Sequence, residues 1–254
     1  MKKYEFTGET KQVELLFRTA TLHRIRAVVE FGLVKVGDLG GWIEKEENLS
    51  HEGKAWVWGN AKVWGNAKVW GNAKVCGDAE VWGNAEVWGN AKVWGNAEVW
   101  GNAEVWGNAE VWGNAKVWGN AKVWGNAKVW GNAKVCGDAE VWGNAEVWGN
   151  AKVWGNAEVC GDAEVFSASH VLVIGAIGSR NDFTTFYRDK DGEITVKCGC
   201  FLGKIDKFLE KVTATHGNSK YALVYRAAVE VAKLQIDLSG KAPEKEKRGD
   251  EGNE

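Results

Sequence analysis

Residues 57–74 read VWGNAKVWGNAKVWGNAK, and the same six-residue unit continues without an insertion to Glu164. The stretch holds eighteen hexapeptides of the form V-[WC]-G-[ND]-A-[KE], in which Val and Ala never vary. The other positions exchange only Trp with Cys, Asn with Asp, and Lys with Glu. A short period that stays fixed from Val57 to Glu164 is typical of a solenoid, in which each unit packs only on its neighbours.

The order of residues within the unit indicates which side chains are buried. Successive residues of a strand point to opposite faces, so Ala and Val of A-K-V-W share one face, and Lys or Glu shares the other with Trp. A charge at every sixth position cannot be buried unpaired. We therefore expect Val and Ala inside, Trp and the charges outside, and Gly-Asn at the corner, where Gly accepts unusual backbone angles.

Short strands joined by two-residue corners resemble the hexapeptide repeat of left-handed parallel β-helices, a fold shared by many bacterial acyltransferases. The resemblance implies that three hexapeptides close one triangular coil. Eighteen hexapeptides then give about six coils, or roughly 29 Å of rod at a strand spacing of about 4.8 Å. The expected fold class is mainly β: this β-helix, an N-terminal β cap and a small C-terminal α+β module.

The repeat also indicates that the three walls of the coil are nearly equivalent. Residues 57–99 are identical to residues 117–159, a shift of ten hexapeptides. Ten is not a multiple of three, so the shift is not a whole number of coils. The duplication therefore moved each residue to a different wall, and a binding site confined to one wall becomes harder to maintain.

Stacking residues 18 apart predicts three outward columns of Trp, interrupted by Cys76, Cys136 and Cys160. The expected exposed aromatic ladder consists of Trp58, Trp64, Trp70, Trp82, Trp88, Trp94, Trp100, Trp106, Trp112, Trp118, Trp124, Trp130, Trp142, Trp148 and Trp154. Three interpretations remain open: a stabilising stack of indoles, a protein interface, and a platform for sugar rings or nucleobases.

Residues 1–50 lack the period, and we interpret them as a cap, because an uncovered β-helix end exposes strand edges that template fibres. Strands are expected at 3–13 and 21–29, and turns at Gly8, Gly37, Gly40 and Gly41. Trp42 and Trp56 are interpreted as packing residues. The stretch VKVGDLGGWIEKEENLSHEGKAWV, residues 34–57, resembles phage- and prophage-encoded hexapeptide-repeat proteins of poorly defined function.

The repeat occupies residues 51–168, and a different pattern follows at 169–239. Strands are expected at 170–174, 183–187 and 193–200, the last two forming a hairpin at Asp191-Gly192. Apolar spacing predicts one helix from Ile205 to Gly217 and a second marked by Tyr221, Val224, Tyr225, Ala228, Val231 and Ala232. The strings HVLVIGAIGSRND and VKCGCF resemble the same phage group. Residues 240–254 are charged and expected to be disordered.

Composition narrows the function classes. A net charge of −2 argues against nucleic acid as a partner. No apolar run is long enough for a membrane span, and MKKYEFTGET lacks the apolar core of a secretory signal. The five Cys form no CxxC pair and no zinc spacing, which favours a reducing cytoplasm and predicts neither a metal nor a cofactor.

The sequence offers few candidates for catalytic residues. The hexapeptide acyltransferases need a His base, whereas His23, His51, His170 and His216 all lie outside the repeat. Cys198 or Cys200 as nucleophile, with His170 or His216 as base, is a second enzyme hypothesis, and GAIGSRN at 175–181 could bind an anion. The candidate binding residues are Arg180, Asp182, Arg188, Cys198, Cys200 and His216.

The leading interpretation is a non-catalytic scaffold: a β-helix rod that displays a partner-binding C-terminal module, with a phage or prophage origin implied by the resemblance. The partner would be a protein or a second copy of the chain, and the Trp walls would permit a trimer. Two alternatives remain, a hexapeptide-repeat acyltransferase and a binder of a small sugar or nucleotide ligand through stacked Trp.

Overall fold

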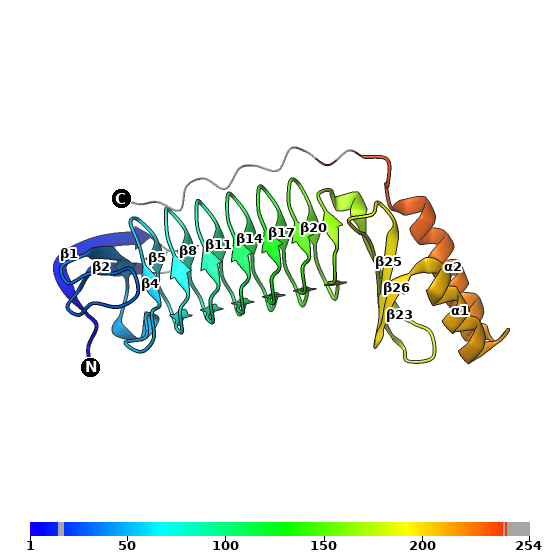
Figure 1. Ribbon diagram of the computed structural model, residues 1–254, viewed down its shortest axis with the longest axis horizontal. Helices are drawn as coiled ribbons and strands as arrows, with labels where there is room; N and C mark the ends of the chain where they lie inside the picture. Colours follow the sequence, from blue (N-terminus) through cyan, green and yellow to red (C-terminus); the bar gives the residue numbers. More distant parts are fainter. Residues whose placement is uncertain (15–17, 241, 243–254) are drawn as a thin grey trace.

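The computed structural model describes residues 1–14, 18–240 and 242, and is mainly β. Along one axis it places an N-terminal hairpin, a parallel β-solenoid, and an antiparallel sheet covered by two helices (Figure 1). The expected fold class is confirmed in these features. Of the predicted disordered segment 240–254, all but Gly240 and Ala242 lie outside the described residues.

Each hexapeptide contributes a strand of two residues, Lys or Glu followed by Val. One wall contains β5 (Lys62–Val63), β8 (Glu80–Val81), β11 (Glu98–Val99), β14 (Lys116–Val117), β17 (Lys134–Val135) and β20 (Lys152–Val153). The second contains β4 (Trp56–Val57), β7 (Lys74–Val75), β10 (Lys92–Val93), β13 (Glu110–Val111), β16 (Lys128–Val129), β19 (Glu146–Val147) and β22 (Glu164–Val165). The third contains β6 (Lys68–Val69), β9 (Glu86–Val87), β12 (Glu104–Val105), β15 (Lys122–Val123), β18 (Glu140–Val141) and β21 (Glu158–Val159).

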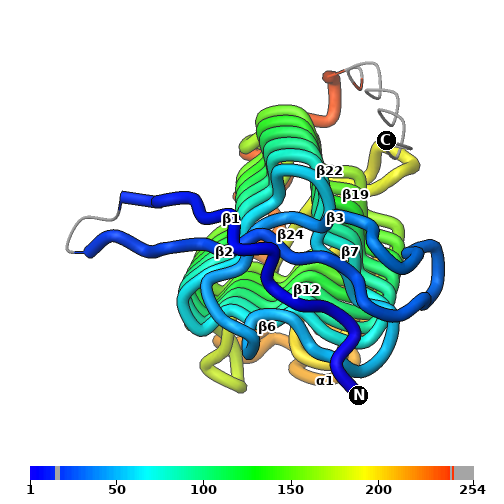
Figure 2. Tube along the Cα trace, turned by 90° about the vertical axis from the view of Figure 1, so that its left-hand side faces the viewer, coloured from blue at the N-terminus to red at the C-terminus, as the bar shows by residue number. Residues whose placement is uncertain are grey.

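The register confirms that three hexapeptides make one coil. Val93 pairs in parallel with Val75 on one side and Val111 on the other, and the same step recurs along each wall. Seen from the N-terminal end, the coils superpose as a three-sided stack (Figure 2). The solenoid has about seven turns, one more than the repeat alone gives, because β3 (Leu39–Ile43) and Leu49 extend two of its walls toward the N-terminus.

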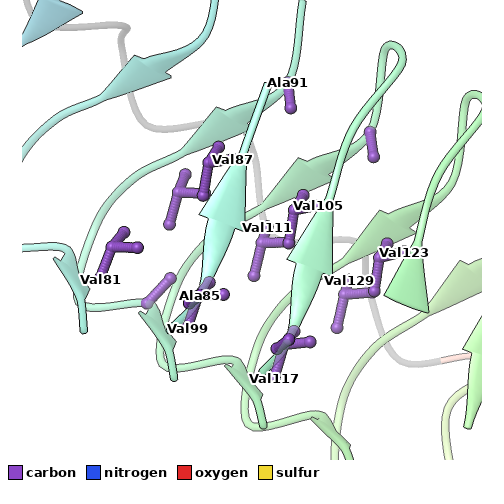
Figure 3. Packing of buried hydrophobic residues seen from close by; sticks show 14 of the residues in the cluster. Val81, Ala85, Val87, Ala91, Val99, Val105, Val111, Val117, Val123 and Val129 are labelled. Atoms are coloured by element: carbon purple, nitrogen blue, oxygen red, sulfur yellow. The ribbon is translucent and has the colours of Figure 1, made fainter. Parts of the chain in front are cut away.

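The interior consists of Val and Ala, as the alternation predicts. Every repeat Val and Ala from Val57 to Val165 is at most 1% exposed. Figure 3 shows Val side chains from the three walls converging between successive coils. Burying one Val side chain contributes about 1.5–3 kcal/mol before the entropy of the chain is subtracted.

The corners are fixed by glycine and asparagine in different ways. Each corner Gly has a positive φ, +74° at Gly101, and a Cβ there would lie 3.0 Å from the nitrogen of Gly119 in the next coil. Only glycine fits such a position. The Asn side chains form amide ladders, in which Asn84 Nδ2 donates to Asn102 Oδ1 at 2.9 Å.

The N-terminal segment closes the first coil. Strands β1 (Tyr4–Glu14) and β2 (Thr19–Ala27) pair antiparallel, and β2 pairs with β3. Tyr4, Ile25 and Trp56 are buried and fill the open end of the Val and Ala core. Lys3 Nζ donates to Ala55 O at 2.7 Å, and burial lowers the pKa of Lys3 to about 8. The helical turn η1 (Glu46–Asn48) places Asn48 Nδ2 2.8 Å from Ala67 O.

The two expected N-terminal strands are confirmed. The turn predicted at Gly8 is wrong, because Gly8 lies within β1, at an irregularity of its pairing with β2. The turn predicted at Gly40 and Gly41 is also wrong. Both residues lie within β3. A Cβ on Gly41 would lie 2.5 Å from Ala61 O, and one on Gly40 would collide with Ile25 and Trp56. These glycines therefore allow close packing of a strand rather than a turn.

The C-terminal module is a four-stranded antiparallel sheet with two helices on its outer face (Figure 1). It comprises η2 (Ala168–His170), β23 (Val171–Ile177), β24 (Asp182–Arg188), β25 (Ile194–Cys198), β26 (Phe201–Lys204), α1 (Ile205–His216) and α2 (Lys220–Gln235). The sequence predicted three strands and missed β26, because the run from Glu193 to Cys200 turns at Gly199 and returns. Gly199 has a φ of +56°, which permits that turn.

Replacing Val105 by Asp should destabilise the rod by more than about 3 kcal/mol, because the carboxylate would be buried without a partner. Glu104→Lys on the same strand is the matched control, since residue 104 is half-exposed between Glu86 and Lys122. Urea denaturation followed by circular dichroism measures both. A Val105→Asp midpoint equal to that of Glu104→Lys would contradict the assigned interior.

Candidate functional site

The sheet of the C-terminal module lies on the last coil of the solenoid. Tyr187 is buried in the solenoid core cluster, and its hydroxyl donates to Cys160 O at 3.0 Å. The N–H of Glu158 donates to Thr185 Oγ1 at 3.0 Å. Ala163 and Asp189 form an antiparallel bridge. The module is therefore bound to the rod through backbone and side chains, rather than tethered to it.

Charged pairs surround this junction. Lys197 Nζ lies 2.7 Å from a carboxylate oxygen of Glu158, and Lys190 Nζ lies 2.9 Å from Asp162. The pair of Lys197 and Glu158 is less exposed than that of Lys190 and Asp162, so its charges are screened less by water. These contacts fix the orientation of the sheet on the coil.

Asp189 is the buried carboxylate of the junction. Burial opposes its ionisation, but hydrogen bonds from Lys204, Thr195 and the N–H of Glu193 outweigh burial and lower the pKa of Asp189. Partial burial likewise opposes the charge of Lys204, but its contacts with Asp189 and Glu193 outweigh burial and raise the pKa of Lys204. A pocket of ≈ 190 Å³ adjoins these groups. Because the chain itself supplies partners to the buried carboxylate, this arrangement suits a structural centre.

Arg188, a predicted binding residue, is buried in this junction. Its guanidinium carbon lies 4.8 Å from the ring centre of Phe166, and Nη1 lies 3.5 Å from a carboxylate oxygen of Glu164. Nη1 also contacts the carbonyl oxygen of Asp189 at 3.3 Å. Arg188 thus holds β24 to the last coil.

Arg180, Asp182 and Cys200 are exposed: Arg180 in the turn before β24, Asp182 at the first residue of β24, and Cys200 in a second turn. Asp182 accepts a hydrogen bond from the N–H of Phe183 at 2.8 Å. The Arg180 guanidinium packs over Gly199, where a Cβ would lie 2.7 Å from Nη1. Cys200 lies in the turn between β25 and β26, so the expectation that the strand continues to residue 200 is wrong.

Cys198 and His216 both lie beside Tyr225, on the helix side of the sheet. Cys198 Sγ accepts from Thr184 Oγ1 at 3.3 Å and lies 4.0 Å from the Tyr225 hydroxyl. The rings of His216 and Tyr225 are 5.9 Å apart. Burial and the neighbouring Cys198 raise the pKa of Tyr225. A Cβ on Gly178 would lie 1.9 Å from the Tyr225 hydroxyl, so the GAIGSRN segment packs on this tyrosine.

His170 is buried at the opposite end of the sheet. Its Nδ1 accepts from the N–H of Phe166 at 3.4 Å, and its ring meets the Phe166 ring edge-on at 4.3 Å. Burial, together with the positive charge of Arg188, lowers the pKa of His170 to about 4. His170 is therefore neutral at pH 7 and serves as a packing acceptor.

The Trp columns stack as the 18-residue spacing predicts. Consecutive indoles, such as Trp88 and Trp106, have centres 4.9 Å apart and planes within 1° of parallel. Within a column each indole covers the face of the next, so the surface presents ring edges. Only an indole at the end of a column or beside a Cys has an uncovered face, which limits stacking of sugars or bases on the walls.

Four of the indoles expected in solvent are buried, which corrects that prediction. Trp64 packs under Ala20 and Leu22 of the N-terminal hairpin. The other three, Trp112, Trp130 and Trp148, form a buried cluster with Phe166. Nε1 of Trp112 has no hydrogen-bond partner among the described residues. Trp154, in contrast, is 58% exposed.

The cysteines in Trp positions lie in different surroundings. Cys160 is 1% exposed beneath Tyr187, where an indole would displace the tyrosine. Cys136 is half-exposed and interrupts the column between Trp118 and Trp154. Cys160 therefore has a packing role at the junction that the sequence did not reveal.

The outer surface of the module carries apolar residues of the second predicted helix. Of the six residues that marked the second helix, Tyr225, Ala228 and Ala232 are buried, whereas Tyr221, Val224 and Val231 are exposed. Leu223 and Leu234 of α2 are also exposed, by 59% and 90%. Helix α2 lies at the C-terminal end of the molecule (Figure 1), and its exposed apolar face is the candidate interaction surface.

Within residues 1–14, 18–240 and 242, no group of three or more His, Cys, Asp or Glu side chains is placed to hold a metal ion. None of the described helices combines the length and the apolar character that crossing a bilayer requires.

Comparison with protein-family models and with curated proteins finds no match for this chain. The resemblance to phage-encoded hexapeptide-repeat proteins therefore stays a prediction.

Cys136→Trp should raise the stability of the rod by about 1 kcal/mol, because an indole at 136 would stack between Trp118 and Trp154. Cys160→Trp should lower stability by about 2 kcal/mol or more, because the indole would overpack the site of Tyr187. Thermal unfolding of the two variants beside the parent chain measures both. Equal shifts of the same sign would contradict the different roles assigned to the two cysteines.

Acid should weaken the junction through His170. The unfolded chain protonates this histidine below about pH 6.5 and the folded protein only below about pH 4, so stability falls as pH drops from 6.5 to 4. The full loss is at most about 3 kcal/mol. His170→Asn keeps an acceptor for the N–H of Phe166 without titrating. Urea midpoints at pH 7 and 4.5 should differ less for this variant; an identical pH dependence would refute the assignment.

Proposed function

We propose that the protein is a non-catalytic scaffold, a β-solenoid rod that carries at its C-terminal end a module for binding a protein partner. The observation that carries the proposal is the exposed apolar face of α2. Val224, Val231 and Leu234 are 40%, 48% and 90% exposed on a helix whose other face is fully packed. Clustered apolar exposure of this kind on a water-soluble surface is typical of protein contacts.

The arrangement of the rod supports a spacing role. Its N-terminal end is closed by Tyr4 and Trp56 and its C-terminal end by the sheet of β24, so both ends of the solenoid are covered. Each coil repeats the previous one, so coil number changes only the length of the rod.

The histidines support a non-catalytic role. Each of the four packs against an aromatic ring: His23 on Phe6, His51 on Tyr4, His170 on Phe166, and His216 on Tyr225. A general base needs a lone pair directed at a substrate proton. The acyltransferase alternative therefore lacks an evident base among the described residues. The alternative of a sugar or nucleotide binder is also less favoured, because most indole faces are covered by the next indole and cannot stack on a ligand.

The resemblance of both terminal segments leads us to propose further that this is an accessory protein of a phage or prophage. Its place of action would then be the cytoplasm of the bacterial host. These two statements rest on the resemblance alone.

A photo-crosslinking amino acid placed at Leu234 in the full chain, expressed in bacteria, tests the function. Protein adducts should form at position 234 and not at Thr215, an exposed residue of α1 in the same helical layer. Deleting one 18-residue coil should leave the adducts unchanged. Absence of adducts at 234, or equal adducts at 215, would overturn the proposal, and adducts lost on shortening would move the site to the rod.

A further inference from the structure

The outer face of α2 has the spacing of a helix–helix seam. Val224, Ala227, Val231 and Leu234 follow at intervals of three, four and three residues, and all four are exposed. Alternation of three and four keeps one stripe of a helix against a partner helix along its length. We refer to these four residues as the α2 stripe.

The other face of α2 is already occupied. Its buried residues are Ala222, Tyr225, Ala228, Val229 and Ala232, which pack on the sheet and on α1. The exposed face of α1 is polar by comparison, with Lys207, Glu210 and Lys211. The uncovered apolar surface is therefore specific to α2 within the helical layer.

The α2 stripe is symmetric about its own centre. The midpoint between Val224 and Leu234 is residue 229, and so is the midpoint between Ala227 and Val231. Consider a two-fold axis that meets the exposed side of α2 at the height of residue 229. It would pair Val224 with a partner's Leu234, and Ala227 with a partner's Val231. Two-fold interfaces use the same patch on both subunits, so they require such self-complementarity.

The charges beside the stripe fit an antiparallel pair. Lys220 at the start of α2 would lie next to the C-terminal end of the partner helix, where the helix dipole is negative. A parallel pair would bring two copies of Lys220 together. Glu230, which lies near the two-fold axis, is paired with Lys233 at 2.8 Å and so adds little net charge there.

We infer that the partner of α2 is a second copy of this chain. This inference rests on the proposed function, which makes α2 the binding surface. The two α2 helices pair antiparallel, and the rods join end to end. The helices form the outermost layer of the module (Figure 1), so the rods point away from each other and do not obstruct the approach.

The size of the stripe predicts a weak dimer. A helix of 16 residues is about 24 Å long. One such face is smaller than the roughly 800 Å² per partner of a standard interface. The dissociation constant is therefore expected in the micromolar range, near about 10⁻⁵ M.

Light scattering of the full chain across about 1 to 500 µM, which brackets that constant, tests the inference. The mass should rise from 27.9 kDa toward twice that value. Val231→Glu should keep the protein monomeric, since it places two carboxylates in the seam, and Thr215→Glu on α1 should dimerise like the parent. A monomer at every concentration, a trimer, or a dimer insensitive to Val231→Glu would overturn the inference.

Disulfide trapping tests the antiparallel register. In a Cys200→Ser background, which removes the exposed thiol, a mixture of Ala227→Cys and Val231→Cys chains should cross-link under oxidant. Neither variant alone should do so to the same extent. Cross-linking of each variant with itself would indicate a parallel pair and refute the register. If the protein is monomeric but still forms adducts with another protein at position 234, the inference of a second copy is contradicted and the proposed function is unaffected.

Discussion

The parallel ladder between successive coils is the constraint on which the rest of the structure depends. Every strand within the solenoid pairs with the strands three hexapeptides before and after it, so hydrogen bonding is complete except at the two ends. The two non-repeating segments cover these two ends. The N-terminal hairpin inserts Tyr4 and Ile25 into the first coil, and the C-terminal sheet inserts Tyr187 into the last. The caps are thus consequences of the repeat, and only the surfaces that face away from it are free for binding.

The equivalence of the three walls explains what the rod tolerates and where it is specialised. The interior Val and Ala do not vary within the repeat, whereas Trp exchanges with Cys and Asn with Asp at the surface. Along the ladders an Asn donates its amide to the next corner, so Asp138 can accept from Asn120 and end the ladder without disturbing the core. Two specialised positions lie next to the caps, with Trp64 under the hairpin and Cys160 under Tyr187. The buried cluster of Trp112, Trp130 and Trp148 extends from Phe166 along one wall. Function is therefore better sought at the ends than along the walls.

The sequence was sufficient to predict the coil, its register, the buried Val and Ala and the stacked Trp columns, because each depends only on a strict local period. It was not sufficient where distant segments meet. Nothing local to Gly41 indicates that Ala61 O approaches it, and nothing local to Cys160 indicates Tyr187. Arg188 was predicted to bind a partner but lies in the junction with the last coil, because the sequence near Arg188 does not show that the coil packs against it. The apolar spacing predicted the second helix, but it could not say which apolar side of that helix meets the sheet, and it did not single out Ala227 or Leu234.

The length of the rod can change without changing the structure of the caps at its two ends. The caps contact the coils at the two ends of the solenoid, with Lys197 of the C-terminal module reaching Trp142 in the last coil but one. Loss or gain of hexapeptides in the middle of the solenoid therefore leaves both caps intact. One hexapeptide changes the rotation of one end relative to the other by a third of a turn, whereas three change the length by one coil. The internal duplication, a shift of ten hexapeptides, is a step of this kind. In an end-to-end dimer such a step would lengthen both rods and rotate the N-terminal caps while the α2 contact stayed the same, so slippage in the repeat can adjust reach without altering recognition.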